Sequence, residues 1–555
     1  MTTLSAMPCR ALLASLILLL NITQASAATT LVNNVNGYTF NDEGSLIQFT
    51  SLVIDEGKVA TLNTDKSADA FDHVIDGKGK TMLPGLIDAH GHLMGLGANL
   101  LEVDLREADS ASDAVERVAA YAMGNTDQPW LIGRGWNQEL WPDRAFPTAS
   151  QIDSKLSARP VWLVRVDGHA GWANSKALAM AGVTAETPDP EGGQIMRDAS
   201  GKPTGVLIDN AMALVESQLP EETREQLSAR LNAAGAHLLS EGITGMHDAG
   251  ISHRVYDFYL AQTLNQRMPV RVYAMLAATD PKLSMMLDNG IITSPDDFLH
   301  IRSVKAYGDG ALGSRGAALL EAYSDAPHQH GLLLTQPDDM DSLFTKVLGA
   351  GFQLNYHAIG DKANRLALDA FARVFGESGG RDLRNRIEHA QVVAPSDLPR
   401  FAELEVLPSM QPTHATSDMN MAEDRIGEDR MKGAYAWQTL LESGIAVPLG
   451  SDFPVELANP FYGIHAAVTR QDRNNNPVDG WYAHEALTTE QALKGFTLDA
   501  AYAAHMEDKV GTLTPGKWAD FILIDRDIFT IEPQDLWKTQ VLATYVAGES
   551  QYQAD

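Results

Sequence analysis

Short apolar runs alternate with helix-like segments through the middle of the chain, and this alternation predicts repeated strand and helix units. Eight apolar runs have the character of strands, and eight parallel strands are the number that closes a barrel. We therefore predict an α/β fold, a (β/α)8 TIM-type barrel that occupies residues 83–510. The strand candidates are residues 82–88, 242–247, 270–275, 301–306, 352–357, 386–389, 405–410 and 446–450.

Both ends of the chain instead show short strand-like runs separated by turn residues such as Asn, Asp and Gly. Two β-rich ends around a long middle indicate one small β-sandwich, assembled from residues 28–82 and 511–555. The strand-like runs are residues 38–40, 51–54, 58–62, 73–75, 517–524 and 540–546.

The first two barrel strand candidates are separated by about 150 residues, far more than an ordinary strand-to-helix connection needs. The excess predicts an inserted subdomain at about residues 100–235. Because active sites of this fold lie at the barrel mouth, we expect the insertion to sit over that mouth. It contains two motifs rich in polar and aromatic groups, GRGWN at residues 133–137 and DGHAGW at residues 167–172.

Residues 1–27 have the pattern of a secretory signal peptide. Arg10 precedes an apolar run at residues 11–20, and the small residues ASA at 25–27 offer a cleavage site. We expect cleavage after Ala27 and export, to the periplasm of a Gram-negative cell. A retained membrane anchor is the alternative, although nothing after Ala27 extends the apolar run. Cys9, the single cysteine, precedes the run, so the mature chain has no thiol chemistry.

The formal net charge of −30 changes the range of partners to consider. A polyanion of this size is repelled by phosphate backbones and by anionic lipid surfaces, which argues against nucleic-acid and peripheral-membrane roles. We expect a small-molecule substrate, no nucleic-acid partner and no stable membrane insertion after signal cleavage. The sequence leaves a homodimer open.

The strongest chemical signal is the motif PGLIDAHGH at residues 84–92. In an extended strand His90 and His92 point to the same side, because side chains alternate with a period of two. Two imidazoles at the end of an apolar strand supply half of a metal site. A His-x-His pair alone is a weak signal, but here the preceding residues indicate a buried strand that ends in a loop.

Four more polar residues stand at the ends of later strand candidates, and the carboxyl ends of barrel strands converge on one mouth. Taken singly, each histidine could be a core residue and the lysine a buried salt-bridge partner. All of these positions agreeing by chance is improbable, which favours a common site. The four residues are Lys305, His357, His389 and Asp452; His247 and His414 are weaker candidates near strand ends.

These motifs resemble the amidohydrolase superfamily, in the amidohydrolase 3 branch that includes N-substituted formamide deformylase. The resemblance covers nearly the whole mature chain and is specific for family, not for substrate. One departure is the N-terminal sandwich, where the usual glycine-containing hairpin is hard to recognise. The matching segments are residues 84–92, 304–317, 357–361, 386–390, 450–454 and 511–520, with 167–169 and 174–178 in the insertion.

The resemblance implies one or two divalent metal ions per chain. His90, His92 and Asp452 would bind one ion, and His357 and His389 a second. Zinc suits a mixed imidazole and carboxylate site, although metal supply can override affinity.

The resemblance also implies roles in catalysis. Lys305, once carboxylated by carbon dioxide, would bridge the ions, because a carbamate supplies two anionic oxygens where an ammonium could not. A metal-activated water would be the nucleophile, and Asp452 would accept its proton and pass it to the leaving amine.

Three residues are candidate substrate contacts. Arg315 would orient a substrate oxygen or carboxylate, with a loop salt bridge as the alternative. His169 would hydrogen-bond the substrate, on the strength of the resemblance. Trp136, together with Trp172, would form an aromatic wall, with core packing as the alternative.

The leading hypothesis is a metal-dependent hydrolase of a non-peptide carbon–nitrogen bond, of amide or formamide type. The same site on another bond would make the protein an esterase or a carbonyl isomerase. An alternative of another class is an inactive binding or regulatory protein. The complete ligand set argues against that alternative, because a decayed site is expected to lose at least one ligand.

Overall fold

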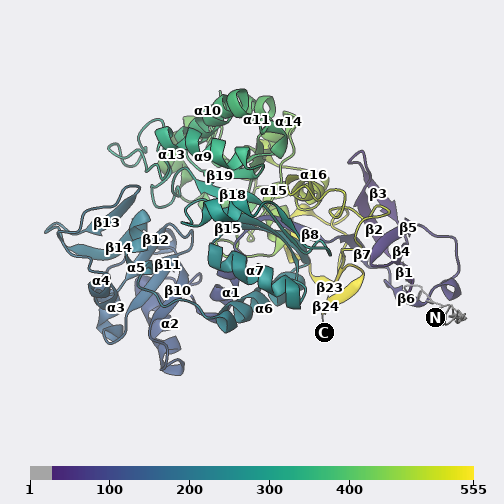
Figure 1. Ribbon diagram of the computed structural model, residues 1–555, viewed down its shortest axis with the longest axis horizontal. Coiled ribbons are helices and arrows are strands. Elements are labelled where there is room, and N and C mark those ends of the chain that lie inside the picture. Colours follow the sequence, from purple (N-terminus) through teal and green to yellow (C-terminus); the bar gives the residue numbers. More distant parts are fainter. Residues whose placement is uncertain (1–27, 555) are drawn as a thin grey trace, which may run out of the picture.

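The computed structural model describes residues 28–554; the predicted signal peptide, residues 1–27, lies outside the described residues. Seven parallel strands form a curved sheet in chain order at the centre of the molecule (Figure 1). This sheet confirms the predicted TIM-type barrel. The strands are β8 (Leu86–Gly91), β15 (Ile243–Ile251), β16 (Arg271–Ala277), β18 (Leu299–Tyr307), β19 (Gln353–Ala358), β20 (Arg386–His389) and β21 (Leu407–Ser409).

The eighth predicted strand, residues 446–450, closes the barrel without being a regular strand. Leu449 forms a parallel bridge to Met410 on one side, and Phe453 forms a parallel bridge to Gly91 on the other. Single bridges on both sides join the last strand position to the first. The barrel is therefore nearly closed, with its most irregular wall between β21 and β8.

The first predicted strand, residues 82–88, is in fact two strands. β7 (Thr81–Pro84) pairs within the terminal β-sheet, whereas β8 belongs to the barrel. Gly85 lies between them, and a Cβ at this position would come within 2.2 Å of the Thr244 side chain. The absence of a side chain at Gly85 lets the chain pass from one sheet to the other against β15.

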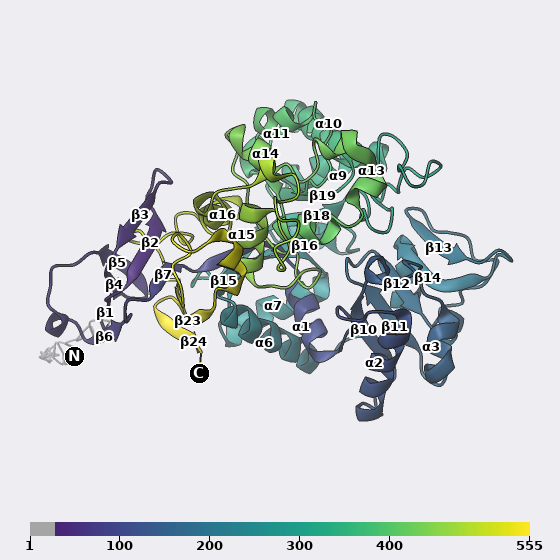
Figure 2. The same cartoon turned by 180° about the vertical axis from the view of Figure 1, so that it is seen from behind.

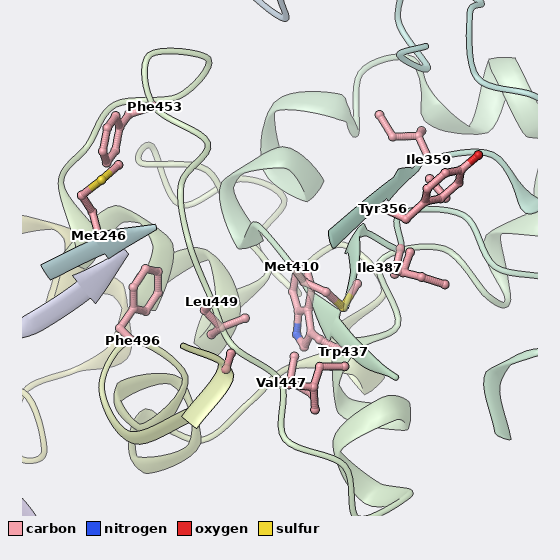
Figure 3. Packing of buried hydrophobic residues seen from close by; sticks show 14 of the residues in the cluster. Met246, Tyr356, Ile359, Ile387, Met410, Trp437, Val447, Leu449, Phe453 and Phe496 are labelled. Atoms are coloured by element: carbon pink, nitrogen blue, oxygen red, sulfur yellow. The ribbon is translucent and has the colours of Figure 1, made fainter. Parts of the chain in front are cut away.

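Helices cover the outside of the barrel (Figure 2). α10 (Asp361–Ser378) buries Ala363, Ala367, Phe371 and Val374, which recur at helical spacing. Figure 3 shows part of the barrel core, including Val447 and Leu449 from the irregular wall. The other covering helices include α6 (Arg224–Ser240), α7 (His253–Asn265), α9 (Pro337–Gly349), α11 (Leu398–Leu404), α14 (Trp437–Glu442), α15 (Pro460–Thr469) and α16 (Thr489–Gly495).

The predicted sandwich is present and draws strands from both termini. Its two sheets share a core that includes Val32 and Leu52 from the N-terminal part and Phe521 from the C-terminal part. A buried ion pair joins it to the barrel: Nε of Arg271 lies 2.6 Å from Asp520. The strands run β5 (Lys58–Leu62), β4 (Leu52–Asp55), β1 (Thr30–Asn33), β6 (His73–Asp76) in one sheet and β24 (Glu549–Gln553), β23 (Val541–Val546), β22 (Phe521–Ile524), β7, β2 (Asn36–Phe40), β3 (Leu46–Phe49) in the other.

The insertion follows α1 (Leu93–Leu101) and has its own mixed sheet and its own apolar cores. Figures 1 and 2 show the insertion and the sandwich on opposite sides of the barrel. Among residues 28–554 no helix has the length and hydropathy needed to span a membrane. The insertion sheet has the order β13 (Gly193–Arg197), β14 (Pro203–Asp209), β12 (Ala170–Ala173), β11 (Val161–Arg165), β10 (Leu131–Trp136), β9 (Val103–Asp104).

Candidate metal centre

The end of β8 and the irregular wall bring two histidines and an aspartate together. Nε2 of His92 lies 3.1 Å from Oδ1 of Asp452, and Nε2 of His90 lies 3.7 Å from the same oxygen. One ligand atom from each residue falls within 4.8 Å of the others. The two histidines at the end of β8 and the aspartate that follows the eighth strand position therefore lie close enough together to hold a single ion.

A buried acid fixes this junction. The Asp88 carboxylate accepts the backbone N–H of His90 at 3.0 Å and the Ser451 hydroxyl at 2.6 Å. Burial raises the pKa of Asp88 to about 7, against the effect of these hydrogen bonds. Asp88 thus ties β8 to the segment that carries Asp452, and it holds the two ligand-bearing strands in register.

A second group shares Asp452. His389, at the end of β20, and His414, in α12 (Pro412–Asp418), each place a ring nitrogen within 4.8 Å of the Asp452 carboxylate. His357, at the end of β19, packs its ring 4.6 Å from the His389 ring. The structure therefore brings all the predicted histidines together and adds His414, which the sequence marked as a weaker candidate.

Lys305 lies at the same place, 1 % exposed near the end of β18, with Nζ 4.4 Å from the Tyr307 ring centre. Within residues 28–554 no carboxylate lies at ion-pair distance from it. The carboxylate of Asp309, four residues further along the chain, instead accepts the backbone N–H groups of Ala318, Ile359 and Gly360 at 2.8–2.9 Å. The simple Lys305–Asp309 ion pair is not formed.

Burial favours the neutral form of three of these histidines, and the surroundings of Asp452 favour its ionised form. Burial lowers the pKa of His90 to about 4 and the pKa values of His357 and His389 well below the usual value. Burial opposes ionisation of Asp452, but the neighbouring imidazoles, with His92 first among them, hold its pKa well below the ordinary range. Neutral imidazole and ionised carboxylate are the forms that bind metal.

The donor atoms are also open to a ligand. Nε2 of His90, Nε2 of His357 and Oδ1 of Asp452 are buried without a hydrogen-bond partner. Buried polar atoms are rarely left in this state unless something else satisfies them. These residues fit a divalent ion, and zinc among the ions that bind imidazole and carboxylate.

A charged network behind His90, not predicted from the sequence, orients its ring. Glu388 accepts a hydrogen bond from Nδ1 of His90, which leaves Nε2 facing Asp452. Nε of Arg386 lies 2.7 Å from Glu388, and Nη1 of Arg386 lies 2.8 Å from Nδ1 of His247. Such a carboxylate fixes the tautomer of a ligating histidine. The alternation of polar residues in RIEH, residues 386–389, within a buried strand was the sequence feature that could have indicated this network. His247, the weaker sequence candidate, belongs to the network through its contact with Arg386.

The candidate ligands His90, His92, His357, His389 and Asp452, together with Lys305 and His414, line one cavity of about 970 Å³, whose other wall comes from the insertion. His169 reaches it between β11 and β12, with Nδ1 2.6 Å from Asp209 and its ring 5.3 Å from the His357 ring. Its predicted position beside the site agrees with the structure, whereas Asp209 was not foreseen. The charged residues on this wall include Arg134, Arg165, Asp167, Asp209 and Glu216.

Two predicted substrate contacts lie elsewhere. Arg315 pairs with Asp325 at 2.8 Å in a surface loop and does not line the cavity. Trp136 is fully buried in the insertion core, where its indole N–H donates to the carbonyl oxygen of Leu163 at 2.8 Å. For both residues the alternative weighed in the sequence, a loop salt bridge and core packing, is the one that the structure shows.

Comparison with known proteins agrees with this geometry. The chain is 35 % identical over 536 residues to Protein LONG AFTER FAR-RED 3 of Arabidopsis thaliana, covering 93 % of this chain and 91 % of that protein. It is 27 % identical over 542 residues to N-substituted formamide deformylase of Arthrobacter pascens, covering 94 % and 98 %.

A crystal structure of an uncharacterized metal-dependent hydrolase from Pyrococcus horikoshii OT3 has a similar fold, with a TM-score of 0.74 and 26 % identity. The match covers 91 % of this chain and 99 % of that one. The model of the amidohydrolase family matches residues 73–552, which span the sandwich, the barrel and the insertion. With the ligand histidines at its strand ends and this match along almost its whole length, the chain belongs to the amidohydrolase family of hydrolases.

Proposed function

We propose that this hydrolase cleaves a non-peptide carbon–nitrogen bond, of amide or formamide type, with one or two zinc ions. The observation that carries the proposal is the convergence of neutral imidazoles and one ionised carboxylate on a single cavity. The similarity to N-substituted formamide deformylase supports an amide-like substrate.

The residues of the chain divide the work. A divalent ion held by His90, His92 and Asp452 would lower the pKa of a water molecule enough to supply a nucleophile near neutral pH. Asp452, 3.1 Å from His92, would accept a proton from a water molecule in the cavity and pass it to the leaving nitrogen. His169 hydrogen-bonds the substrate from the opposite wall, and the enclosing insertion limits access of bulk water.

We also propose that Lys305 is carboxylated and helps to hold a second ion with His357 and His389. Burial without a carboxylate partner among the described residues supports this role, because an unpaired ammonium in such a place is costly. The carbamate would add anionic oxygens beside His357 and His389, where the nearby carboxylates are Asp452 and Asp309, whose Oδ1 lies 3.5 Å from Nε2 of His357.

The experiment is metal analysis of purified protein combined with a panel of formamides, secondary amides and esters. We expect bound zinc and turnover of an amide or formamide, loss of turnover after removal of metal with a chelator, and recovery when zinc is restored. Preferred ester turnover would replace the proposed bond class. Zinc-loaded protein without turnover on any class would favour a binding or regulatory role.

Export remains part of the proposal and rests on the pattern of residues 1–27. N-terminal sequencing of protein from cell fractions tests it. A chain that begins at Ala28 outside the cytoplasmic membrane is expected, and an intact Met1 in the cytosol would contradict it.

A further inference from the structure

Asp209 combines backbone strain with complete burial of its side chain. It ends β14 with φ 49° and ψ −127°, a conformation that favours glycine, and its carboxylate is 0 % exposed. Such a conformation costs free energy for any residue except glycine, and contacts of the Asp209 side chain are expected to offset that cost.

The barrel is shaped around this carboxylate. A Cβ added at Gly310 would lie 2.7 Å from Oδ2 of Asp209, and one at Gly316 would lie 2.9 Å from it. Neither glycine has a positive φ, so the space for Asp209 is what the missing side chains provide at both. The loop that follows β18 therefore receives an acid from the insertion.

The carboxylate in this space orients one ring. Oδ1 of Asp209 lies 2.6 Å from Nδ1 of His169, and its backbone N–H donates to the His169 carbonyl oxygen at 3.0 Å. With the carboxylate oxygen as the acceptor of this bond, Nδ1 of His169 donates the hydrogen. Nε2 is then the ring nitrogen left for the cavity, on a ring 5.3 Å from that of His357.

We propose that Asp209 is a positioning residue that holds His169 with Nε2 toward the scissile group. Because Asp209 comes from the insertion and lies against Gly310 and Gly316 of the barrel, the packing of the insertion on the barrel then determines the position of His169. The inference rests on the proposed function, in which His169 hydrogen-bonds the substrate. Asp209 itself need not touch the substrate; it acts through His169.

A double-mutant cycle on zinc-loaded enzyme tests this. Asp209→Asn and His169→Ala should each lower kcat/KM by roughly 10- to 100-fold, with zinc content unchanged. In the His169→Ala background Asp209→Asn should have almost no further effect. If the fold-losses in kcat/KM of the two single variants multiply in the double variant, the proposal is overturned. Asp198→Asn, an exposed acid of the same insertion, is the matched control and should retain the wild-type kcat/KM.

A spectroscopic readout separates positioning from folding. In protein labelled with 15N-histidine, the Nδ1–H signal of His169, assigned by its absence in His169→Ala, should shift or vanish in Asp209→Asn. An unchanged signal would overturn the proposal. This readout does not need turnover, so it still decides the role of Asp209 if the amide panel fails.

The glycine pocket gives a second, independent cycle. Gly310→Ala should reduce kcat/KM about as much as Asp209→Asn, because the three atoms nearest to the new methyl group all belong to the Asp209 carboxylate. In an Asp209→Gly background, which empties the pocket and relieves the strained backbone, Gly310→Ala should cost no further activity. A Gly310→Ala loss that persists without Asp209 would mean that the glycine serves another purpose.

Discussion

The two walls of the active-site cavity are built on different principles. The barrel wall places its histidines at the ends of buried strands, and neighbouring strands hold each one through backbone pairing. The insertion wall places His169 on the connection between two inner strands of a separate sheet, β11 and β12. Under the proposed function the first wall would hold the metal and the second would contact the substrate, through residues that lie outside the barrel.

The largest effect should come from the barrel wall. Replacing His90 and His92 together by Ala should abolish turnover and remove at least one equivalent of metal, because too few donors remain to hold the ion. Elemental analysis and activity measure both. His484→Ala, an exposed histidine far from the barrel ligands in sequence, is the control. Full metal occupancy in the double variant would place the ligands elsewhere.

Lys305 sharpens the comparison within the barrel wall. Lys305→Ala should lose the second ion as well as activity, and Lys305→Arg should also fail, since a guanidinium does not form the carbamate. Metal-free wild-type protein should regain activity better when bicarbonate accompanies zinc. A fully active Lys305→Arg enzyme would exclude the bridging carbamate and leave a one-metal site based on His90, His92 and Asp452.

Damage to the insertion should separate stability from metal binding. Trp136→Ala removes a fully buried indole and should cost about 3–5 kcal/mol of folding stability, by creating a cavity in the insertion core. Zinc content of the folded protein should stay unchanged, because every proposed ligand belongs to the barrel. Chemical unfolding and elemental analysis test both halves; loss of zinc from folded protein would show that the walls are not independent.

The smallest effect should come from Arg315. Its pair with Asp325 is partly exposed, and such pairs contribute about 0–1 kcal/mol. Arg315→Ala should therefore leave kcat/KM within about twofold of the wild type and change stability little. A loss of two orders of magnitude in kcat/KM, with stability intact, would restore Arg315 as a substrate contact.

The barrel and its ligands could be predicted because their signals are local. An apolar run that ends in His357, His389 or Lys305 indicates both a buried strand and a polar side chain at its carboxyl end. The strands and the residues at the barrel mouth could therefore be predicted from the sequence pattern. The eighth strand and the β7–β8 junction were less regular than predicted, because single bridges and a close approach at Gly85 are set by neighbouring strands.

The partners of these residues could not be predicted for the opposite reason. Glu388 and His90 are 298 positions apart, and Asp209 and His169 are 40 apart, with no shared motif to join them. Residue type alone also fails to separate roles: Arg315 and Trp136 have side chains suited to binding, and only packing assigns one to a loop ion pair and the other to a core.

The chain leaves the barrel for the insertion after α1 and returns in α6, and these two helices touch so closely that a Cβ at Gly97 would lie 2.2 Å from the carbonyl oxygen of Arg230. The two ends of the insertion are therefore held next to each other by the contact between α1 and α6. Because every proposed metal ligand lies outside the insertion, a different segment placed between these helices would leave those ligands unchanged. Under the proposed function, recombination at this junction would be a route to new substrates. A replacement segment would also need a carboxylate in the space at Gly310 and Gly316, because without one its substrate-contacting side chain would lack the positioning that Asp209 gives His169.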